Sequence, residues 1–383
     1  MFEVRSASVC DDGAAVRVEW EDGEAARFHA IWLRDNARDP DTRAENGQRL
    51  ITVNQIARDT RVTLAAARDG QLVANFMPEN KERTFDGAWL KAHIYDRADS
   101  GMAGRLPAEA EAWGGDFDVS QVDGDFNQII NDDECMREWL AHVRRYGFAT
   151  VSGGPTAEQS LFRLVERFGF VRETNYGRLF EVRTEVNPTN LAYTGLGLQA
   201  HTDNPYRDPQ PTLQILYCLE NSAEGGESLV VDGFAAAQRL RAEDPAGFDM
   251  LTHYCARFEF SGQDGVCLRS RRPMIELAAD GELNAIRFNN RSAAAITDVP
   301  YDDMAAYYAA YQRFADIVDD PAMAPCFKLG PGEAFIVDNT RVMHSRRAFS
   351  GTGSRWLQGC YADKDGLLST LAALDQRTQA AAE

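Results

Sequence analysis

Apolar and polar positions alternate along most of the first hundred residues, which predicts β-strands joined by short turns. The alternation breaks at residues 21–23 (EDG), a typical hairpin turn. Residues 72–93 repeat the plan of strand, polar turn and strand. Segments 28–33 (FHAIWL) and 85–90 (FDGAWL) therefore look like two copies of one unit, and we predict a small β-sandwich-like module.

The pattern changes after residues 96–118, which are rich in glycine, alanine and acidic residues and which we interpret as a linker. Beyond it, helical spacing, as in residues 132–145, alternates with apolar strand-like runs. The helices are too few for a doubly wound α/β sheet, so a β-sandwich or barrel wrapped by helices fits better. We place an N-terminal β domain at 1–105 and a second domain at 106–383. The helical segment 366–381 has one apolar stripe, suited to docking on its own domain or on a second subunit.

Composition narrows the possible partners. Hydrophobic residues make up 44% of the 383 positions, enough for a sizeable core. The net charge of −19 has the wrong sign for binding nucleic acid or an anionic membrane. We find no run of ~20 apolar residues and no secretory signal pattern, and we expect a cytoplasmic protein. The seven cysteines are scattered without CxxC spacing, which predicts buried small side chains instead of disulfides or a cysteine zinc site.

One histidine stands out from the other candidates. His201 lies two residues before Asp203, just after the strand-like segment LAYTGLGL. Residues i and i+2 of an extended chain project to the same side, so this imidazole and carboxylate can bind one ion; a hydrogen-bonded surface pair is the competing interpretation. Four other histidines lie in patterned segments without a carboxylate or cysteine at ligand spacing, which favours packing or surface roles: His29, His93, His142 and His253.

A third ligand should come from a distant strand, and His344 is the obvious candidate. Two histidines and one carboxylate leave three positions of a metal open, the arrangement that non-haem Fe(II) uses. Eleven residues later comes Arg355. If the two segments are neighbouring strands, Arg355 points toward the metal face and can hold a carboxylate. Ser228, after two glycines, suits the same carboxylate or a turn.

Together these segments resemble the Fe(II)/2-oxoglutarate dioxygenases, and among them the γ-butyrobetaine hydroxylase group. The resemblance covers almost the whole chain, through WLRDN, HTDNPYRDP, GGESLVVDGF, VDN, HSRRAF and GSRWLQGCYAD. It implies a double-stranded β-helix, or jelly roll, for the second domain, and hydroxylation of a C–H bond coupled to decarboxylation of 2-oxoglutarate. It places iron on His201, Asp203 and His344, and 2-oxoglutarate against Arg355, Ser228 and Leu216.

The resemblance also implies a substrate site. An aromatic cage for a trimethylammonium group would consist of Tyr176, Phe180, Tyr193 and Tyr361, and amides for the acid group would be Asn190 and Asn289. Taken singly, each aromatic residue would more often be core than cage. As a set, they suit a quaternary ammonium. We expect replacement of Tyr193 or Tyr361 by alanine to raise the substrate KM while iron binding survives.

The chain departs from the family in two places. WLRDN is normally followed by cysteines that bind zinc with a histidine, but here ARDPDTR follows, so we predict no zinc. Where the substrate's acid group would bind, Asn204, Arg207 and Arg291 add donors that would favour a phosphonate, although a salt bridge to an acidic loop would also explain Arg291. The preferred substrate is therefore 2-(trimethylammonio)ethylphosphonate, hydroxylated next to phosphorus.

Several alternatives stay open. γ-Butyrobetaine, which would give L-carnitine, is the nearest, and trimethyllysine or a sulfonate is more distant. From another class, a non-catalytic sensor of iron and 2-oxoglutarate could use the same fold, although a sensor has no need for an open iron site. The family forms homodimers, and we expect one here.

Overall fold

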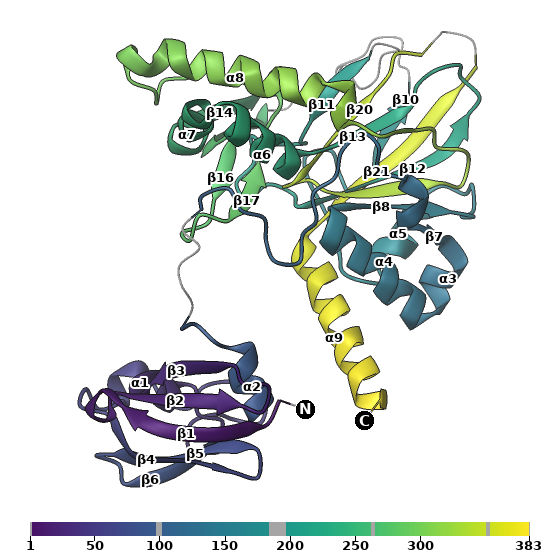
Figure 1. Cartoon of the computed structure of the whole chain (residues 1–383). Helices are drawn as coiled ribbons and strands as arrows, with labels where there is room; N and C mark the ends of the chain where they lie inside the picture. The colour runs from purple at the N-terminus through teal and green to yellow at the C-terminus, as the bar shows by residue number, and fades with distance from the viewer. Residues whose placement is uncertain (1, 97–101, 184–196, 262–264, 350–352, 383) are drawn as a thin grey trace. The chain divides into compact units, whose positions relative to one another are not determined.

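The structure is a computed structural model that describes residues 2–96, 102–183, 197–261, 265–349 and 353–382. Contacts divide the chain into two compact units, residues 1–100 and 101–383 (Figure 1). Among the described residues, none of the helices has the length and apolar character needed to cross a membrane.

The first unit packs two small antiparallel sheets around one core, as the alternating pattern predicts. Its fully buried side chains include Trp20, Phe28 and Phe76, which belong to different strands. The hairpin turn predicted at residues 21–23 joins two paired strands. One sheet has the order β1 (Val4–Cys10), β2 (Ala15–Trp20), β3 (Ala25–His29), and the other β4 (Arg61–Arg68), β5 (Gln71–Met77), β6 (Lys81–Phe85).

The repeated FHAIWL and FDGAWL segments fold alike. β3 runs directly into helix α1 (Ala30–Asp35), and β6 runs into helix α2 (Gly87–Ala92). The tryptophans of the two copies, Trp32 and Trp89, stack with ring centroids 5.6 Å apart. The two copies therefore form equivalent strand-to-helix corners.

Ion pairs hold the segment after α1, which contains the sequence ARDPDTR. The guanidinium groups of Arg34 and Arg83 are buried, and both bind Glu79, at 2.5 and 2.9 Å. Arg83 also pairs with Asp39, and Arg34 donates to Thr42 at 3.0 Å. Burial opposes ionisation of Glu79, but the two arginines outweigh it and lower the pKa of this carboxyl. This arginine–carboxylate cluster, Arg34, Asp39, Thr42, Glu79 and Arg83, ties the segment after α1 to the β5–β6 hairpin.

Replacing Arg83 by methionine should destabilise the first unit by about 2 kcal/mol, because the partly buried carboxylate of Asp39 loses its arginine and that of Glu79 keeps only Arg34. Hydrogen–deuterium exchange of peptides from residues 61–85 would measure the lost protection. Arg68→Met is the matched control, since Arg68 pairs with Glu82 on the exposed surface and should change little. A chelator should leave the wild-type protection unchanged; lost protection would contradict the prediction that no zinc is bound.

The second unit is a jelly roll, which confirms the predicted class of a mainly β fold with flanking helices. Its larger sheet is antiparallel apart from the β7–β8 pair, and the smaller sheet carries β11 and β20 side by side. The larger sheet contains β10 (Phe180–Arg183), β21 (Arg355–Ala362), β12 (Leu213–Asn221), β19 (Ala334–Asp338), β8 (Phe148–Ser152), β7 (Asp123–Asp125) and β9 (Val171–Arg172). The smaller contains β11 (Leu198–His201), β20 (Val342–Arg346), β13 (Ser228–Asp232) and β18 (Cys326–Phe327).

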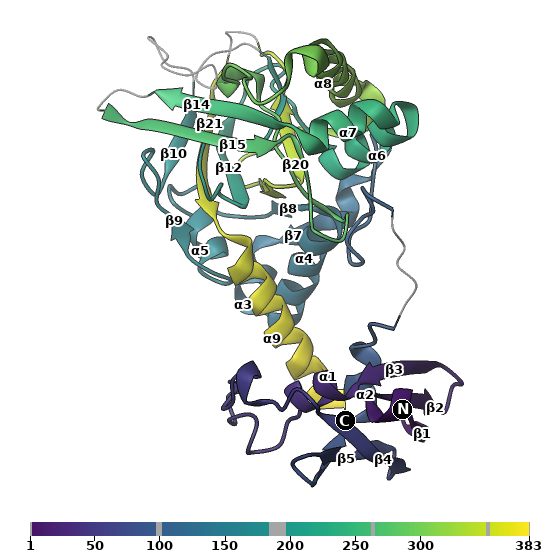
Figure 2. The ribbon, with the colours of Figure 1, turned by 90° about the vertical axis from the view of Figure 1, so that its left-hand side faces the viewer.

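Helices cover both sheets. Against the larger sheet lie α3 (Phe126–Asn131), α4 (Asp133–Tyr146) and α5 (Leu161–Val165), and α9 (Lys364–Ala382) packs on α4. Against the smaller sheet lie α6 (Gly233–Glu243) and α8 (Met304–Asp319), and α7 (Pro245–His253) packs on these two helices (Figure 1). Two strand pairs complete the unit: β14 (Cys255–Ser261) with β15 (Cys267–Pro273) (Figure 2), and β16 (Ile275–Leu277) with β17 (Leu283–Ile286) (Figure 1). The helix expected at 132–145 is α4: Asp132 caps its first turn and Gly147, at φ +78°, ends it.

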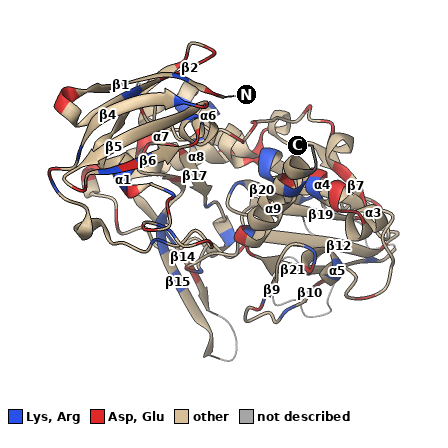
Figure 3. Ribbon diagram, turned by 90° about the horizontal axis from the view of Figure 1, so that it is seen from below, with Lys and Arg blue, Asp and Glu red and all other residues tan. Residues whose placement is uncertain are grey.

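The last helix docks on its own unit. Leu367, Leu371 and Leu374 of α9 are buried in the core beside α4. Basic and acidic residues mingle along α4 and α9 (Figure 3), and Arg137 pairs with Asp375 at 3.4 Å. The apolar stripe in the sequence therefore packs within one chain, and the homodimer remains a prediction.

The predicted linker is too long. Residues 102–118 belong to the second unit, where Trp113 is buried and its Nε1 donates to the carbonyl of Tyr146 at 2.7 Å. Arg341, also buried, donates to the carbonyls of Glu111 (2.5 Å) and Arg145 (2.9 Å). The segment has no periodicity because a few separate apolar side chains, such as Trp113, and hydrogen bonds to its backbone fix it to the unit.

Candidate active site

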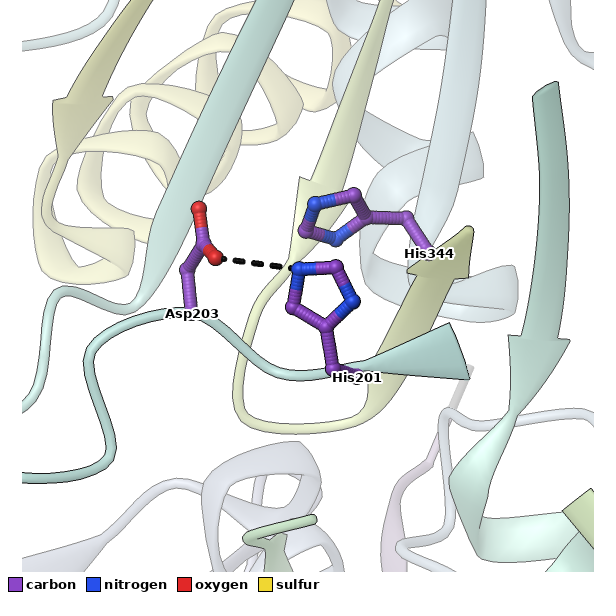
Figure 4. A group of neighbouring side chains, drawn as sticks. All are labelled: His201, Asp203 and His344. Atoms are coloured by element: carbon purple, nitrogen blue, oxygen red, sulfur yellow. Dashed lines mark ion pairs between the residues drawn. The ribbon is translucent and has the colours of Figure 1, made fainter. Parts of the chain in front are cut away.

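Two imidazoles and a carboxylate meet at the paired ends of β11 and β20. His201 and His344 lie directly opposite each other in the β11–β20 register, and Asp203 follows β11. One ligand atom from each residue lies within 4.8 Å of the others (Figure 4). The i, i+2 spacing and the distant third residue thus converge as the sequence predicts.

The three side chains together can bind a metal cation. His201 Nδ1 donates to the carbonyl of Gln199 at 2.7 Å, and its Nε2 lies 3.3 Å from Asp203 Oδ1. Burial, with His201 nearby, lowers the pKa of His344 to about 3, so this imidazole is neutral. Burial opposes ionisation of Asp203, but its hydrogen bond with His201 and the positive charges around it lower the pKa of this carboxyl. Two imidazoles and one carboxylate form a ligand set that suits Fe(II).

A cavity of about 360 Å³ opens beside these three residues, between the two sheets. Two predicted substrate residues, Asn190 and Tyr193, lie outside the described residues. The structure brings all the other predicted site residues to the wall of this one cavity: His201, Asp203, His344, Arg355, Ser228, Leu216, Tyr176, Phe180, Asn204, Asn289, Arg291 and Tyr361.

Arg355 reaches the cavity, but the strand argument for it was wrong. β20 and β21 do not neighbour each other; they belong to opposite sheets, so Arg355 faces the cavity from across the barrel. Arg355 is 9% exposed, and burial lowers the pKa of its guanidinium. Arg355 Nε has no hydrogen-bond partner among the described residues, and Ser228, also buried, lines the same cavity. A buried donor of this kind suits a carboxylate ligand.

A second buried guanidinium, Arg346, was missed. It follows His344 by two residues on β20 and lies opposite Ser228 on β13. Burial, with Arg355 nearby, lowers the pKa of Arg346 to about 10. Both guanidinium groups lie over the ring of Phe349, at 4.8 and 5.8 Å from its centroid. The i, i+2 rule that singled out Asp203 could have found Arg346 from His344.

Aromatic rings line another part of the cavity. Phe180 and Tyr361 are 5.0 Å apart between centroids, with an interplanar angle of 31°. Tyr206 and Phe260 were missed: Phe260 stacks on Tyr206 at 5.1 Å and meets Tyr176 edge-on at 5.9 Å. Tyr206 could have been found in the HTDNPY segment, whereas nothing in the sequence marks Phe260, which the β14–β15 hairpin brings in.

The asparagines predicted to bind the substrate differ in whether they still have a hydrogen-bond donor available for a ligand. Asn289 Oδ1 accepts from the backbone of Arg291 and Ser292, at 3.1 and 3.3 Å, and its amide donates to the carbonyl of Thr202 at 3.0 Å. Asn289 is thus largely committed to local structure.

Asn204, in contrast, keeps a donor. Its Oδ1 accepts from Tyr206 at 2.5 Å, while its buried Nδ2 has no partner among the described residues. Arg207, close by in the chain, instead binds Asn175 and is not among the described residues that line the cavity. Asn204 is therefore the better placed of these side chains to donate to a ligand.

A His-Asp-His set beside a buried guanidinium, between the sheets of a jelly roll, defines an Fe(II)/2-oxoglutarate-dependent oxygenase. Sequence comparison agrees: residues 106–361 match the taurine catabolism dioxygenase TauD, TfdA family, and residues 8–76 match the γ-butyrobetaine hydroxylase-like N-terminal family. The chain belongs to the TauD, TfdA family and, within it, to the γ-butyrobetaine hydroxylase group.

Relatives match along nearly the whole chain. The γ-butyrobetaine dioxygenase of Pseudomonas sp. (strain AK-1) is 36% identical over 374 residues, 97% of this chain and 96% of that protein. The Homo sapiens γ-butyrobetaine dioxygenase is 30% identical over 98% of both chains, and the trimethyllysine dioxygenase of Meyerozyma guilliermondii 28% over 95% and 94%. Among solved structures, asparagine oxygenase with Fe(II), 3-hydroxyasparagine and succinate covers 63% of this chain and 93% of its own, at 16% identity and a TM-score of 0.47.

Proposed function

We propose that this protein hydroxylates a small trimethylammonium zwitterion, with 2-(trimethylammonio)ethylphosphonate as the preferred substrate and the carbon next to phosphorus as the site of reaction. Hydroxylation of γ-butyrobetaine to L-carnitine is the alternative. The observation that carries the proposal is one cavity with aromatic rings and several guanidinium groups beside the His-Asp-His set.

The cofactor residues have separate tasks. His201, Asp203 and His344 would hold Fe(II), which supplies the oxygen chemistry when bound. Arg355 and Ser228 would bind the distal carboxylate of 2-oxoglutarate. The pair formed by a buried guanidinium and a carboxylate is strong because little water competes for it.

The aromatic wall would bind the cation. A trimethylammonium group cannot donate hydrogen bonds, but it is attracted to π faces, each contact contributing ~0.5–2 kcal/mol. Tyr176, Phe180 and Tyr361 line the cavity with Tyr206 and Phe260. The γ-butyrobetaine and trimethyllysine dioxygenases among the relatives support a trimethylammonium substrate.

Charge favours the phosphonate over the carboxylate. The described lining carries the guanidinium groups of Arg291, Arg346 and Arg355 against the carboxylates of Asp203 and Glu259. Fe(II) and doubly charged 2-oxoglutarate would cancel each other, which leaves an excess of one positive charge. A phosphonate dianion with one ammonium group is a net monoanion and balances it, whereas γ-butyrobetaine is neutral. The free amide of Asn204 would serve the additional phosphonate oxygen.

Turnover in direct competition tests this proposal. Iron-loaded protein with 2-oxoglutarate and oxygen should convert 2-(trimethylammonio)ethylphosphonate to a +16 Da product faster than equimolar γ-butyrobetaine, measured by mass spectrometry. Carnitine as the main product would establish the alternative. Binding of iron and 2-oxoglutarate without product from any trimethylammonium compound would favour a sensor.

Arg291→Gln should raise KM for the phosphonate about 10- to 100-fold, the cost of one charge-assisted hydrogen bond, and change KM for γ-butyrobetaine much less. Arg207→Gln is the matched control, because Arg207 is bound to Asn175 instead. Equal effects of Arg291→Gln on both substrates would assign Arg291 a structural role.

We also propose that the enzyme works in the cytoplasm as a homodimer. Family resemblance supports the dimer, and the acidic composition supports the location. Sedimentation equilibrium of the purified chain tests the dimer, and a mass of 42.6 kDa would contradict it.

A further inference from the structure

Hydrogen bonds from neighbouring side chains hold the backbone of Asp203 in place. Its backbone N–H donates to Asn339 Oδ1 at 2.7 Å. Its carbonyl accepts from Asn339 Nδ2 at 2.9 Å and from Gln210 Nε2 at 3.0 Å. Its backbone is therefore held by buried amides, and only the orientation of the carboxylate remains to be set.

Two further donors meet on one oxygen of that carboxylate. Gln214 Nε2 donates to Asp203 Oδ2 at 2.6 Å, and the hydroxyl of Tyr361 donates to the same oxygen at 2.8 Å. The other oxygen, Oδ1, faces His201 Nε2 at 3.3 Å (Figure 4). Gln214 and Tyr361 are 2% and 5% exposed and lie opposite each other on β12 and β21, so the sheet itself sets their spacing.

We propose that Gln214 and Tyr361 are positioning residues that make Asp203 a ligand through Oδ1 alone. We name this pair the Asp203 clamp. An oxygen that accepts two short hydrogen bonds has little lone-pair density left for a metal. A carboxylate bound through both oxygens would occupy an additional position of the metal, whereas this class of site needs three positions open. The clamp rests on the proposed iron site and explains how its carboxylate is oriented.

Tyr361 then has two roles, because its ring also lies against Phe180 in the wall of the cavity. This revises one expectation from the sequence. Replacing Tyr361 by alanine should weaken iron binding as well as raise the substrate KM, because the hydroxyl and the ring are lost together. Tyr361→Phe separates the roles, since it keeps the ring and removes only the bond to Asp203.

Anaerobic Fe(II) titration of the full chain without substrate tests the clamp. Tyr361→Phe and Gln214→Met should each raise the Kd for Fe(II) about 10- to 100-fold, as is usual when a partner of a metal ligand is removed. The substrate KM of Tyr361→Phe, measured at saturating iron, should stay close to that of the wild type. That contrast between Kd and KM distinguishes positioning from general damage to the cavity.

Tyr176→Phe is the matched control. It removes another hydroxyl from the same cavity, but one that bonds Tyr206 at 2.9 Å and not Asp203, so the Kd for Fe(II) should not change. Wild-type Kd values in both clamp variants would overturn the proposal, and so would an equal loss in Tyr176→Phe. Because the titration contains no substrate, its outcome does not depend on which substrate the enzyme uses. A wild-type protein that binds no Fe(II) would overturn both the clamp and the proposed function.

Discussion

Asp232→Ala should destabilise the second unit by about 3–5 kcal/mol, because it leaves a buried guanidinium without its counterion. The Asp232 carboxylate accepts from Arg341 Nε at 3.0 Å and Nη2 at 2.8 Å, and both side chains are almost fully buried. The same carboxylate accepts from the backbone N–H groups of Phe234 and Trp113, at 3.0 and 3.3 Å. Its loss should therefore loosen α6 and the segment at Trp113 together.

Calorimetry of the full chain, with hydrogen exchange to assign each transition to a unit, measures this effect. Asp375→Ala is the matched control: it removes one partner of the partly exposed pair with Arg137, at 3.4 Å, and should cost less than about 1 kcal/mol. Similar losses in the two variants would show that Asp232 has no special role. Asp232→Asn should fall between them, because its amide oxygen can still accept.

Arg355→Gln should raise the Kd for 2-oxoglutarate about 100-fold or more, the result of truncating a buried charge pair that contributes roughly 2–5 kcal/mol. The buried Nε of Arg355 has no protein partner among the described residues, so a ligand carboxylate is its natural acceptor. Fe(II) affinity should not change, because Arg355 makes no hydrogen bond to the His-Asp-His set. Anaerobic titration of the iron-loaded protein with 2-oxoglutarate measures the change.

Two variants make this test specific. Arg355→Lys keeps the charge but loses the forked geometry and should give an intermediate Kd. Arg347→Gln removes an exposed guanidinium close by in the chain and should have no effect. A wild-type Kd in Arg355→Gln would move the cosubstrate to Arg346, the other buried guanidinium on the Phe349 ring.

Local spacing predicted the metal residues well. His201 and Asp203 are two positions apart at the end of one strand, so their proximity follows from backbone geometry alone. The run TLQILYCL (residues 212–219), one of the apolar strand-like runs beyond the linker, lies in β12 from Leu213 onward. Pairing between distant strands cannot be derived in this way. The argument for Arg355 depended on a strand that neighbours the His344 strand, but the jelly roll puts Arg355 on the opposite sheet.

Residues whose role depends on such pairing were missed. Gln214 sits within an apolar run and gives no local signal, because its importance comes from the register of β12 with β21. Phe260 reaches the cavity only through the packing of a hairpin. The segment 102–118 looked like a linker because its partners, such as Arg341, lie more than two hundred residues away in the chain.

The arginine–carboxylate cluster of the first unit should respond to oxidants and to acid differently from a thiolate zinc site. Guanidinium and carboxylate groups do not undergo the stepwise oxidation that thiolates do, so mild oxidants that would dismantle a cysteine site should leave this cluster intact. Its weakness is acid instead. Because Asp39 and Glu79 have lowered pKa values, the stability that they contribute is present at neutral pH and is lost as pH falls through those values.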